Sequence, residues 1–335
     1  MIFKENSSLY KLNTFGINVM AKQFAAFSSV DELGEILENK IEHKLILGGG
    51  SNILFTKNYD GLVLKNEIGG ITKINEDEHH IYIHAGAGVV WNDLVMYCIE
   101  NNYAGVENLS LIPGSVGASP MQNIGAYGVE IKDIFHSLEA YNIEGKKVVK
   151  FTNTDCEFGY RESVFKNKFK NEFVILNVTF RLNKIPTFNT SYGAIENELE
   201  KMGVQLKSIK AISDAVINIR RSKLPDPSVI GNAGSFFKNP TIANAQFNLL
   251  KEKFENIVGY PFGENQVKLA AGWLIEQCGW KGFRKNDAGC HEKQALVLVN
   301  YGNAKGDEIL GLSGEIILSV EDKFGVRLSR EVNMV

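Results

Sequence analysis

Residues 111–128 read Leu-Ile-Pro-Gly-Ser-Val-Gly-Ala-Ser-Pro-Met-Gln-Asn-Ile-Gly-Ala-Tyr-Gly. The four glycines, two serines and adjacent glutamine and asparagine of this stretch favour neither a regular helix nor a regular strand. A loop of this length inside a compact domain is usually functional. Its hydroxyls, amides and unobstructed backbone suit a large polar ligand that carries a diphosphate and a hydrogen-bonding ring.

A second glycine-rich loop, Gly48-Gly49-Gly50-Ser51-Asn52, follows the apolar segment 44–47, which is typical of a short buried strand. Glycines let backbone N–H groups converge on an anion, and the serine and asparagine add side-chain donors. A Walker loop is excluded because no Gly-Lys-Ser/Thr follows, which leaves a phosphate-binding loop or a tight turn. A third stretch, Gly86-Ala87-Gly88, has Trp91 where a dinucleotide-binding fold needs a glycine, so a Rossmann interpretation is rejected.

The composition is that of a globular protein. The chain has 335 residues, of which 44% are hydrophobic and 22% charged, with a net charge of -3. This length predicts about two or three domains. Nucleic acid is not expected as a partner because there is no basic run, and no membrane contact is expected because no apolar stretch approaches the roughly 18 residues of a spanning helix. The four cysteines form no CxxC pair, and the first residues lack the apolar core of a signal peptide, so we expect a cytoplasmic protein.

Helical and strand patterns are mixed along the chain, which predicts an α+β fold. Ser29 is expected to cap a helix that ends near Asn39, with Glu32 at the capping-box position. Residues 136–141 and 148–151 predict a hairpin around Glu144-Gly145, and the proline pair at 225–227 predicts a domain boundary. Further elements are expected as helices at 91–99, 209–219, 241–254, 268–278 and 307–324, and as strands at 62–64, 81–84, 173–180 and 295–299.

Taken together, the loops at 48–52 and 112–128 and the segment Phe158-Gly159-Tyr160-Arg161 resemble the UDP-N-acetylenolpyruvoylglucosamine reductase (MurB) family. This is a family of FAD enzymes in peptidoglycan precursor synthesis. The likeness runs from about residue 13 to the C-terminus, through 13–16, 223–227, 231–240 and 270–275. The loop form at 118–123 and the segment 191–193 are similar to the longer, type I branch.

The resemblance implies an α+β architecture with an FAD-binding region of the PCMH type, made of two α+β subdomains, and a smaller α+β substrate-binding domain. We expect residues 1–70 to form the first FAD-binding subdomain, with 326–335 packing near it. Residues 71–224 are expected to form the second, and 225–325 the substrate-binding domain. The implied cofactor is non-covalent FAD, the implied partners are NADPH and UDP-N-acetylglucosamine enolpyruvate, and the protein is expected to be a monomer.

The resemblance assigns the two long glycine-rich loops to FAD. The residues expected to bind it are Gly48, Gly49, Gly50, Ser51, Asn52, Ile53, Leu54, Pro113, Gly114, Gly117, Ser119, Gln122, Asn123, Gly125 and Ala126.

The family reduces an enol ether that carries a carboxylate: NADPH reduces FAD, and flavin N5 then gives hydride to one vinyl carbon. This chemistry needs a cation at the carboxylate and a proton donor at the adjacent carbon. By resemblance, Ser235 is the proton donor, Arg161 holds the carboxylate and the developing enolate, and Glu331 polarises the reacting centre. Without the resemblance, Ser235 is interpreted as a cap or turn residue, and Arg161 as the partner of Glu157 or Glu162 in a surface ion pair.

The substrate's UDP part is expected to contact Tyr192, Lys223, Asn239 and Gln294, with Tyr127 and Tyr160 as further substrate-binding residues. By analogy, Tyr192 closes over the substrate as a lid. No metal site is expected, because Cys290-His291 has no second ligand pair at zinc spacing. Family members commonly have an arginine and an aromatic residue after the Glu-Val pair, where this chain has Asn333-Met334.

Two other functions compete with a reductase. One is a flavin-dependent oxidase of alcohols or amines; such enzymes often attach FAD through His or Cys, and neither occurs in the loops at 48–52, 86–88 or 112–128. The other is a non-catalytic sensor of UDP-sugars or nucleotides. The presence of Ser235, Arg161 and Glu331 favours the enzyme over the sensor.

Overall fold

The structure is a computed structural model that describes residues 3–39, 42–191 and 193–335. The chain divides into two compact units, and each unit is assembled from segments far apart in the sequence. Unit 1 comprises Met1–Asn6, Lys22–Gly49 and Asp60–Ser222, and unit 2 comprises Ser7–Ala21, Gly50–Tyr59 and Lys223–Val335. The division into three domains stays a prediction.

A four-stranded sheet, most of which belongs to unit 1, has the order β1 (Lys4–Ser8), β2 (Met20–Phe27), β5 (Tyr59–Asn66) and β3 (Lys44–Leu47). Strands β3 and β5 run parallel, so their carboxyl ends lie at the same edge, where the chain continues into Gly48. Helix α1 (Val30–Glu38) buries Leu33 and Ile36 in the core of this sheet. The sheet therefore presents the first glycine-rich loop at one edge.

The expected capping of α1 is confirmed in part. The Ser29 hydroxyl accepts the N–H of Glu32 at 3.2 Å. The Glu32 carboxylate, however, accepts the N–H of Ser28 at 2.6 Å, one residue before the expected partner.

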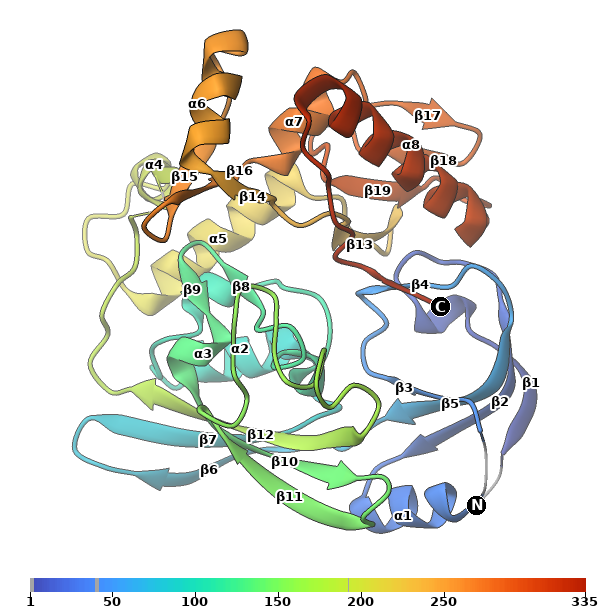
Figure 1. The fold of residues 1–335 in the computed structure, drawn as a ribbon. Coiled ribbons are helices and arrows are strands. Elements are labelled where there is room, and N and C mark those ends of the chain that lie inside the picture. Colours follow the sequence, from blue (N-terminus) through green and yellow to red (C-terminus); the bar gives the residue numbers. More distant parts are fainter. Residues whose placement is uncertain (1–2, 40–41, 192) are drawn as a thin grey trace. The chain divides into compact units, whose positions relative to one another are not determined.

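The second sheet of unit 1 is antiparallel, with the order β11 (Lys147–Thr152), β10 (Phe135–Asn142), β12 (Phe173–Asn183), β7 (His80–Gly86) and β6 (Ile71–Glu76) (Figure 1). The pairing of β10 with β11 confirms the predicted hairpin. Helix α2 (Trp91–Glu100) buries Trp91 against one face, with its ring centroid 5.7 Å from that of Phe180. Trp91 is a core residue, as its helical spacing predicts.

Shorter elements of unit 1 surround the long glycine-rich loop. They are the 3-10 turns Glu107–Leu109 and Val116–Ala118, the strands β8 (Gly125–Ala126) and β9 (Val129–Glu130), and helix α3 (Ile131–Ile134). Helices α4 (Gly193–Lys201) and α5 (Ile209–Lys223) pack together through Ile195, Leu199, Ile212 and Val216.

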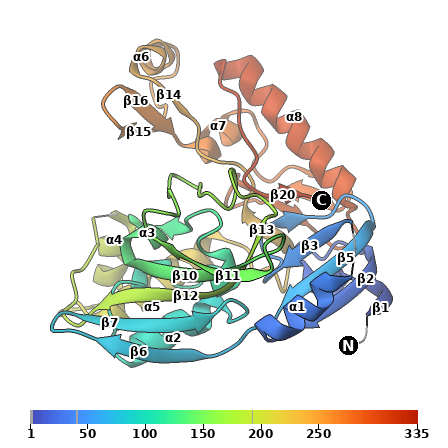
Figure 2. The same cartoon turned by 60° about the horizontal axis from the view of Figure 1, so that its bottom comes forward.

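Unit 2 contains a sheet of order β13 (Gly231–Ser235), β19 (Val297–Asn300), β18 (Ala288–Cys290) and β17 (Arg284–Lys285). The long helix α8 (Gly306–Phe324) packs against β18 and β19 (Figure 1). Figure 2 shows α8 along its length. A smaller sheet pairs β14 (Thr241–Ala243), β16 (Gln266–Leu269) and β15 (Gly259–Phe262), and it is followed by helix α7 (Ala271–Gln277). The remaining elements are helix α6 (Asn244–Lys253), the 3-10 turn Tyr10–Leu12, and the parallel pair β4 (Ile53–Leu54) and β20 (Asn333–Met334).

Two helices of unit 2 begin later than predicted. The helix expected from residue 241 begins at Asn244, because 241–243 form strand β14 on β16. The helix expected from residue 268 begins at Ala271, because 266–269 form β16 itself. Within the part of the chain that the structure describes, no helix combines the length and apolarity that crossing a membrane requires.

Candidate active site

The first two glycine-rich loops meet backbone to backbone within unit 1. A Cβ on Gly49 would lie 2.7 Å from the Cα of Gly114, closer than real carbon atoms approach. A Cβ on Gly48 would overlap the hydroxyl oxygen of Ser115. Glycine is therefore required at both positions for the loops at 48–50 and 113–117 to pack.

Ser115 is a binding candidate that the sequence analysis did not single out. The residue is 6% exposed, and its Oγ is buried without a hydrogen-bond partner among the described residues. A buried hydroxyl without a partner is costly. An anionic oxygen beside the glycine backbone would satisfy it, so this part of unit 1 fits the diphosphate of FAD.

The third glycine-rich stretch, rejected above as a dinucleotide site, supports the long loop. The N–H of Gly117 donates to the carbonyl of Ala87 at 2.9 Å, and the N–H of Val116 donates to that of Val89 at 2.8 Å. Trp91 N–H donates to the Gly114 carbonyl at 3.0 Å. These bonds fix the backbone that carries Ser115.

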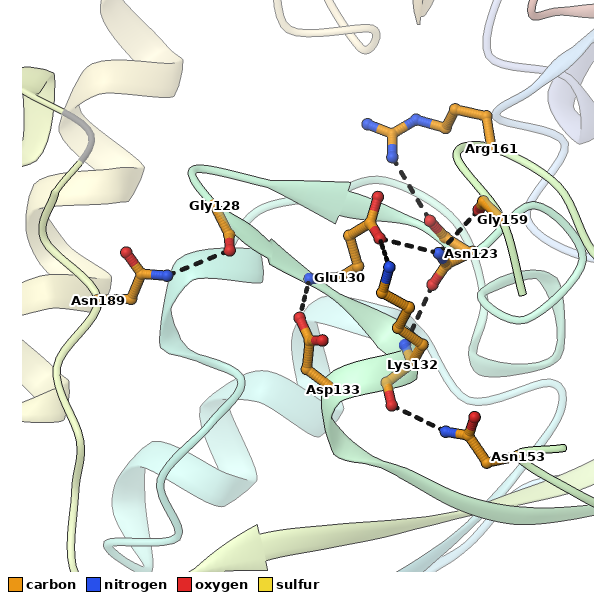
Figure 3. Close-up of polar contacts among 9 residues, drawn as sticks. All are labelled: Asn123, Gly128, Glu130, Lys132, Asp133, Asn153, Gly159, Arg161 and Asn189. Carbon is orange, nitrogen blue, oxygen red and sulfur yellow. Dashed lines mark hydrogen bonds and ion pairs between the residues drawn. The ribbon is translucent and has the colours of Figure 1, made fainter. Parts of the chain in front are cut away.

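Asn123 lies at the centre of a polar network (Figure 3). Its side chain is fully buried, and Nδ2 donates to the Gly159 carbonyl at 2.9 Å and to Glu130 Oε2 at 3.2 Å. Oδ1 accepts the N–H of Lys132 at 3.1 Å. The side chain thus links the long loop to the segment that precedes Arg161, and contact of Asn123 with FAD stays a prediction.

Arg161 is held by the same loop. Nη2 donates to the Gly125 carbonyl at 2.6 Å, and Nη1 donates to the Asn123 carbonyl at 3.4 Å. The arginine occupies a two-residue turn closed by mutual backbone bonds between Gly159 and Glu162. Its φ of 57° is left-handed, a conformation that costs a non-glycine residue about 1–2 kcal/mol. Strain of this kind is often found at functional sites, and the role of Arg161 stays a prediction.

Further contacts brace the network around Glu130 (Figure 3). The ammonium of Lys132 lies 2.8 Å from Glu130 Oε2, and Asn153 donates to the Lys132 carbonyl at 2.9 Å. Asp133 accepts the N–H of Glu130 at 2.8 Å. The residues that bind the Arg161 loop are therefore themselves held by hydrogen bonds and an ion pair.

Tyr127 is positioned by two residues that the sequence analysis did not identify. Nδ2 of the buried Asn108 donates to the carbonyls of Tyr127 at 2.9 Å and Asn189 at 2.8 Å. Arg220 on α5 donates to the Leu111 carbonyl at 3.2 Å and hydrogen-bonds the Tyr127 side chain. Burial lowers the pKa of Arg220, whereas its contact with Tyr127 raises it. These contacts join residues that are far apart in the sequence, so no local sequence pattern predicts them.

In unit 2 the structure brings the segments of Ser235 and Glu331 together. The N–H of Glu331 donates to the carbonyl of Phe236, the residue after Ser235, at 2.8 Å. Phe236 and Phe237 are buried at 0% and 1% exposure, whereas Ser235 is exposed. The two phenylalanines thus anchor a strand end that presents the serine hydroxyl at the surface.

The second half of the first glycine-rich loop also lies beside Glu331 in unit 2. Asn52 Nδ2 donates to the Glu331 carbonyl at 3.4 Å, and the Asn333 side chain donates to the Asn52 carbonyl at 2.9 Å. Strands β4 and β20 extend this pairing over Ile53 and Leu54. Residues predicted to bind the cofactor and a residue predicted to be catalytic are therefore neighbours in one unit.

The remaining substrate-binding candidates divide between the units. Asn239 Oδ1 accepts the N–H of Ala271 at 3.0 Å, and Gln294 Oε1 accepts that of Leu296 at 3.3 Å, both in unit 2. Lys223 is exposed and begins a segment of unit 2. Tyr160 lies in unit 1, where the Arg161 guanidinium is 5.3 Å from its ring centroid. The predicted lid residue Tyr192 lies outside the described residues.

The cysteines carry free thiols. Burial raises the pKa of Cys98, Cys156 and Cys290 to about 12, so these thiols are neutral at physiological pH. Across the described ranges, no group of three or more His, Cys, Asp or Glu side chains is arranged to hold a metal ion.

Comparison with known proteins relates this geometry to a family. Residues 226–335 match the family profile described as "UDP-N-acetylenolpyruvoylglucosamine reductase, C-terminal domain", and residues 21–150 match "FAD binding domain". The UDP-N-acetylenolpyruvoylglucosamine reductase of Amoebophilus asiaticus is 52% identical over 338 residues that cover 100% of both chains. The chain belongs to the UDP-N-acetylenolpyruvoylglucosamine reductase family.

Other relatives agree with this assignment. The UDP-N-acetylenolpyruvoylglucosamine reductase of Flavobacterium johnsoniae is 51% identical and is also covered over 100% of both chains. The crystal structure of the Thermus caldophilus reductase shares the fold, with a TM-score of 0.68 and 20% identity over 99% of this chain and 98% of that one. The predicted α+β fold with an FAD-binding region is confirmed, and the chain is an FAD-dependent oxidoreductase.

Proposed function

We propose that the chain reduces UDP-N-acetylglucosamine enolpyruvate to UDP-N-acetylmuramate with NADPH as the electron donor, in peptidoglycan precursor synthesis in the cytoplasm. The observation that carries the proposal is the pairing of Glu331 with Phe236 beside Ser235, next to Asn52 of the expected cofactor loop. Asn52, Ser235 and Glu331, to which the proposal gives roles, all belong to unit 2.

Arg161 holds the substrate carboxylate and stabilises the enolate that develops next to it. The planar guanidinium suits an anion whose charge is shared by two oxygens. Its bonds to the Asn123 and Gly125 carbonyls orient the group before substrate arrives, which reduces the reorganisation needed during the reaction.

Ser235 donates the proton to the enolate carbon. A serine hydroxyl is a weak acid, but an enolate carbon is basic enough to accept its proton once bound FAD and substrate cover the exposed Ser235 and exclude water. Bound FAD supplies the hydride for the other vinyl carbon. Glu331, whose backbone is fixed by Phe236 and Asn52, polarises the reacting centre.

The two competing functions, an oxidase and a sensor, require other residues than a reductase does. An oxidase with covalent flavin needs a His or Cys in a cofactor loop, and the loops at 48–52, 86–88 and 112–128 have neither. A sensor has no need of a strained arginine, or of a serine followed directly by the residue that binds the Glu331 backbone. The proposal also takes the enzyme to be a monomer, which sedimentation velocity tests.

The proposal is tested by mass spectrometry of the product after incubation with NADPH. The enolpyruvyl group should gain two hydrogen atoms and become a lactyl ether, with one NADPH consumed per product. Unchanged substrate in the presence of bound FAD and NADPH would overturn the proposal.

A further inference from the structure

Lys65 lies where the first glycine-rich loop begins. It is the penultimate residue of β5 and pairs in register with Leu47, the last residue of the parallel strand β3. From that position its ammonium donates a hydrogen bond to the carbonyl oxygen of Gly48. Burial lowers the pKa of Lys65, and Glu67 raises it. A half-buried cation thus contacts the backbone of the loop expected to hold the diphosphate.

This contact sets the direction of one backbone donor. The Gly48 carbonyl and the Gly49 N–H belong to a single planar peptide and point to opposite sides. By holding the carbonyl, Lys65 turns the Gly49 N–H away from itself and polarises it as a donor. The other side of the same peptide is fixed by packing, because the Cα of Gly49 is pressed against the backbone of Gly114.

Independent evidence for an anion comes from Ser115, which lies where a side chain on Gly48 would be. The Ser115 hydroxyl is buried beside the Gly48 Cα and has no hydrogen-bond partner among the described residues. It fits there because Gly48 has a hydrogen atom in place of a side chain. A cation behind the carbonyl and an unsatisfied hydroxyl beside the Cα of the same residue favour a negatively charged ligand at this loop.

We propose that Lys65 is a positioning residue for the FAD diphosphate, acting through the Gly48–Gly49 peptide. Its ammonium orients the Gly49 N–H toward the diphosphate and offsets part of the diphosphate's negative charge. The proposal rests on the binding of FAD by this loop. It assigns to Lys65 a contribution to cofactor affinity, with no part in proton or hydride transfer.

The test is FAD binding by the apoprotein of Lys65→Met, Lys65→Arg and the control Lys44→Met. Lys44 begins β3, at the opposite end of the strand that leads to Gly48, so its loss removes a lysine from the same sheet far from the loop. We expect Lys65→Met to weaken FAD binding about tenfold or more, the effect of losing a charge-assisted hydrogen bond. Lys65→Arg, which keeps the charge, and Lys44→Met should stay within about threefold of wild type.

Phosphorus NMR of bound FAD separates an effect on the diphosphate from a general loosening of the fold. In Lys65→Met the two diphosphate resonances should shift and the salt dependence of FAD binding should weaken, while the visible flavin spectrum stays unchanged. If the Lys65→Met apoprotein does not fold, Lys65→Gln takes its place. Glutamine is shorter and neutral, so even where it still donates to the Gly48 carbonyl, FAD binding should weaken more than about threefold.

Each outcome bears on the proposal. FAD affinity within twofold of wild type in the folded neutral variants, or unchanged phosphorus resonances, would overturn it. A wild-type protein that binds no FAD would instead overturn the proposed function, so the two failures are distinguishable.

Discussion

Asn123 and Arg161 hold each other in place: the Arg161 guanidinium donates to the Asn123 carbonyl at 3.4 Å, and the Asn123 side chain donates to the Gly159 carbonyl at 2.9 Å, where the turn that carries Arg161 begins. The loop expected to bind the cofactor therefore also orients the cation expected to bind the substrate. A substitution in either segment should therefore alter the position of the other.

Replacing Asn123 by Asp tests this coupling. Aspartate cannot donate to Gly159 and places a second carboxylate beside Glu130. We expect kcat to fall at least about tenfold, and the free energy of unfolding to fall by about 1–3 kcal/mol because a buried acceptor loses its donor. Asn153→Asp is the matched control, since Asn153 is exposed at the edge of the same network. Wild-type kcat in Asn123→Asp would show that Asn123 does not position Arg161.

Ser235→Ala separates the proton donor from a structural residue. Reduction of the flavin by NADPH should stay near the wild-type rate, because that step needs no proton from Ser235. Reoxidation by the enolpyruvyl substrate should slow by about 10²–10⁴-fold, the usual contribution of general acid catalysis. Stopped-flow absorbance follows both steps in one protein, and equal slowing of the two would assign Ser235 to the fold alone.

Gly49→Ala tests the close approach of the two glycine-rich loops. The new Cβ would lie 2.7 Å from the Gly114 Cα, so the loops must separate. We expect a loss of about 1–3 kcal/mol of stability, typical of overpacking, together with weaker FAD binding by titration. Gly311→Ala in α8 is the control, because its Cβ would meet no atom within 4 Å and the helix should gain about 0.5–1 kcal/mol. Undiminished FAD affinity in Gly49→Ala would contradict the loop packing.

The buried carboxyl group of Glu107 should make the stability of the fold depend on pH. The residue is 2% exposed, its carboxylate accepts the Gly105 N–H at 2.6 Å, and burial raises its pKa above the ordinary 4.5. Below the pKa that Glu107 has in the unfolded chain, the residue is protonated in both states, and its ionisation does not destabilise the fold. As the pH rises from there through the raised pKa of the folded state, the unfolded chain ionises more readily than the folded protein, so the fold loses stability.

Glu107→Gln removes the charge and keeps the shape. We expect its stability relative to wild type to increase from about pH 4 to pH 7, as measured by urea unfolding at a series of pH values. A difference that does not vary with pH would show that Glu107 titrates normally.

The elements predicted correctly have local signals. The hairpin of β10 and β11 has a Glu-Gly turn between apolar strands, and α2 shows helical spacing from Trp91 to Ile99. Strand β14 has no such signal, because its three residues are extended only through pairing with β16. The same applies to the site: loop composition marks Gly48–Asn52, but the contact of Glu331 with Phe236 joins residues far apart in the chain. The roles inferred for Ser115 and Lys65 could not be predicted from the sequence, because they depend on the packing of the two glycine-rich loops and on the pairing of β3 with β5.

The visible absorption spectrum of the purified protein distinguishes the reductase from the oxidase and the sensor. We predict a flavin spectrum that bleaches with NADPH under anaerobic conditions and returns when UDP-N-acetylglucosamine enolpyruvate is added. A flavin that returns only with oxygen would contradict the account and indicate an oxidase. A colourless protein that FAD cannot reconstitute would contradict it as well and would favour a sensor.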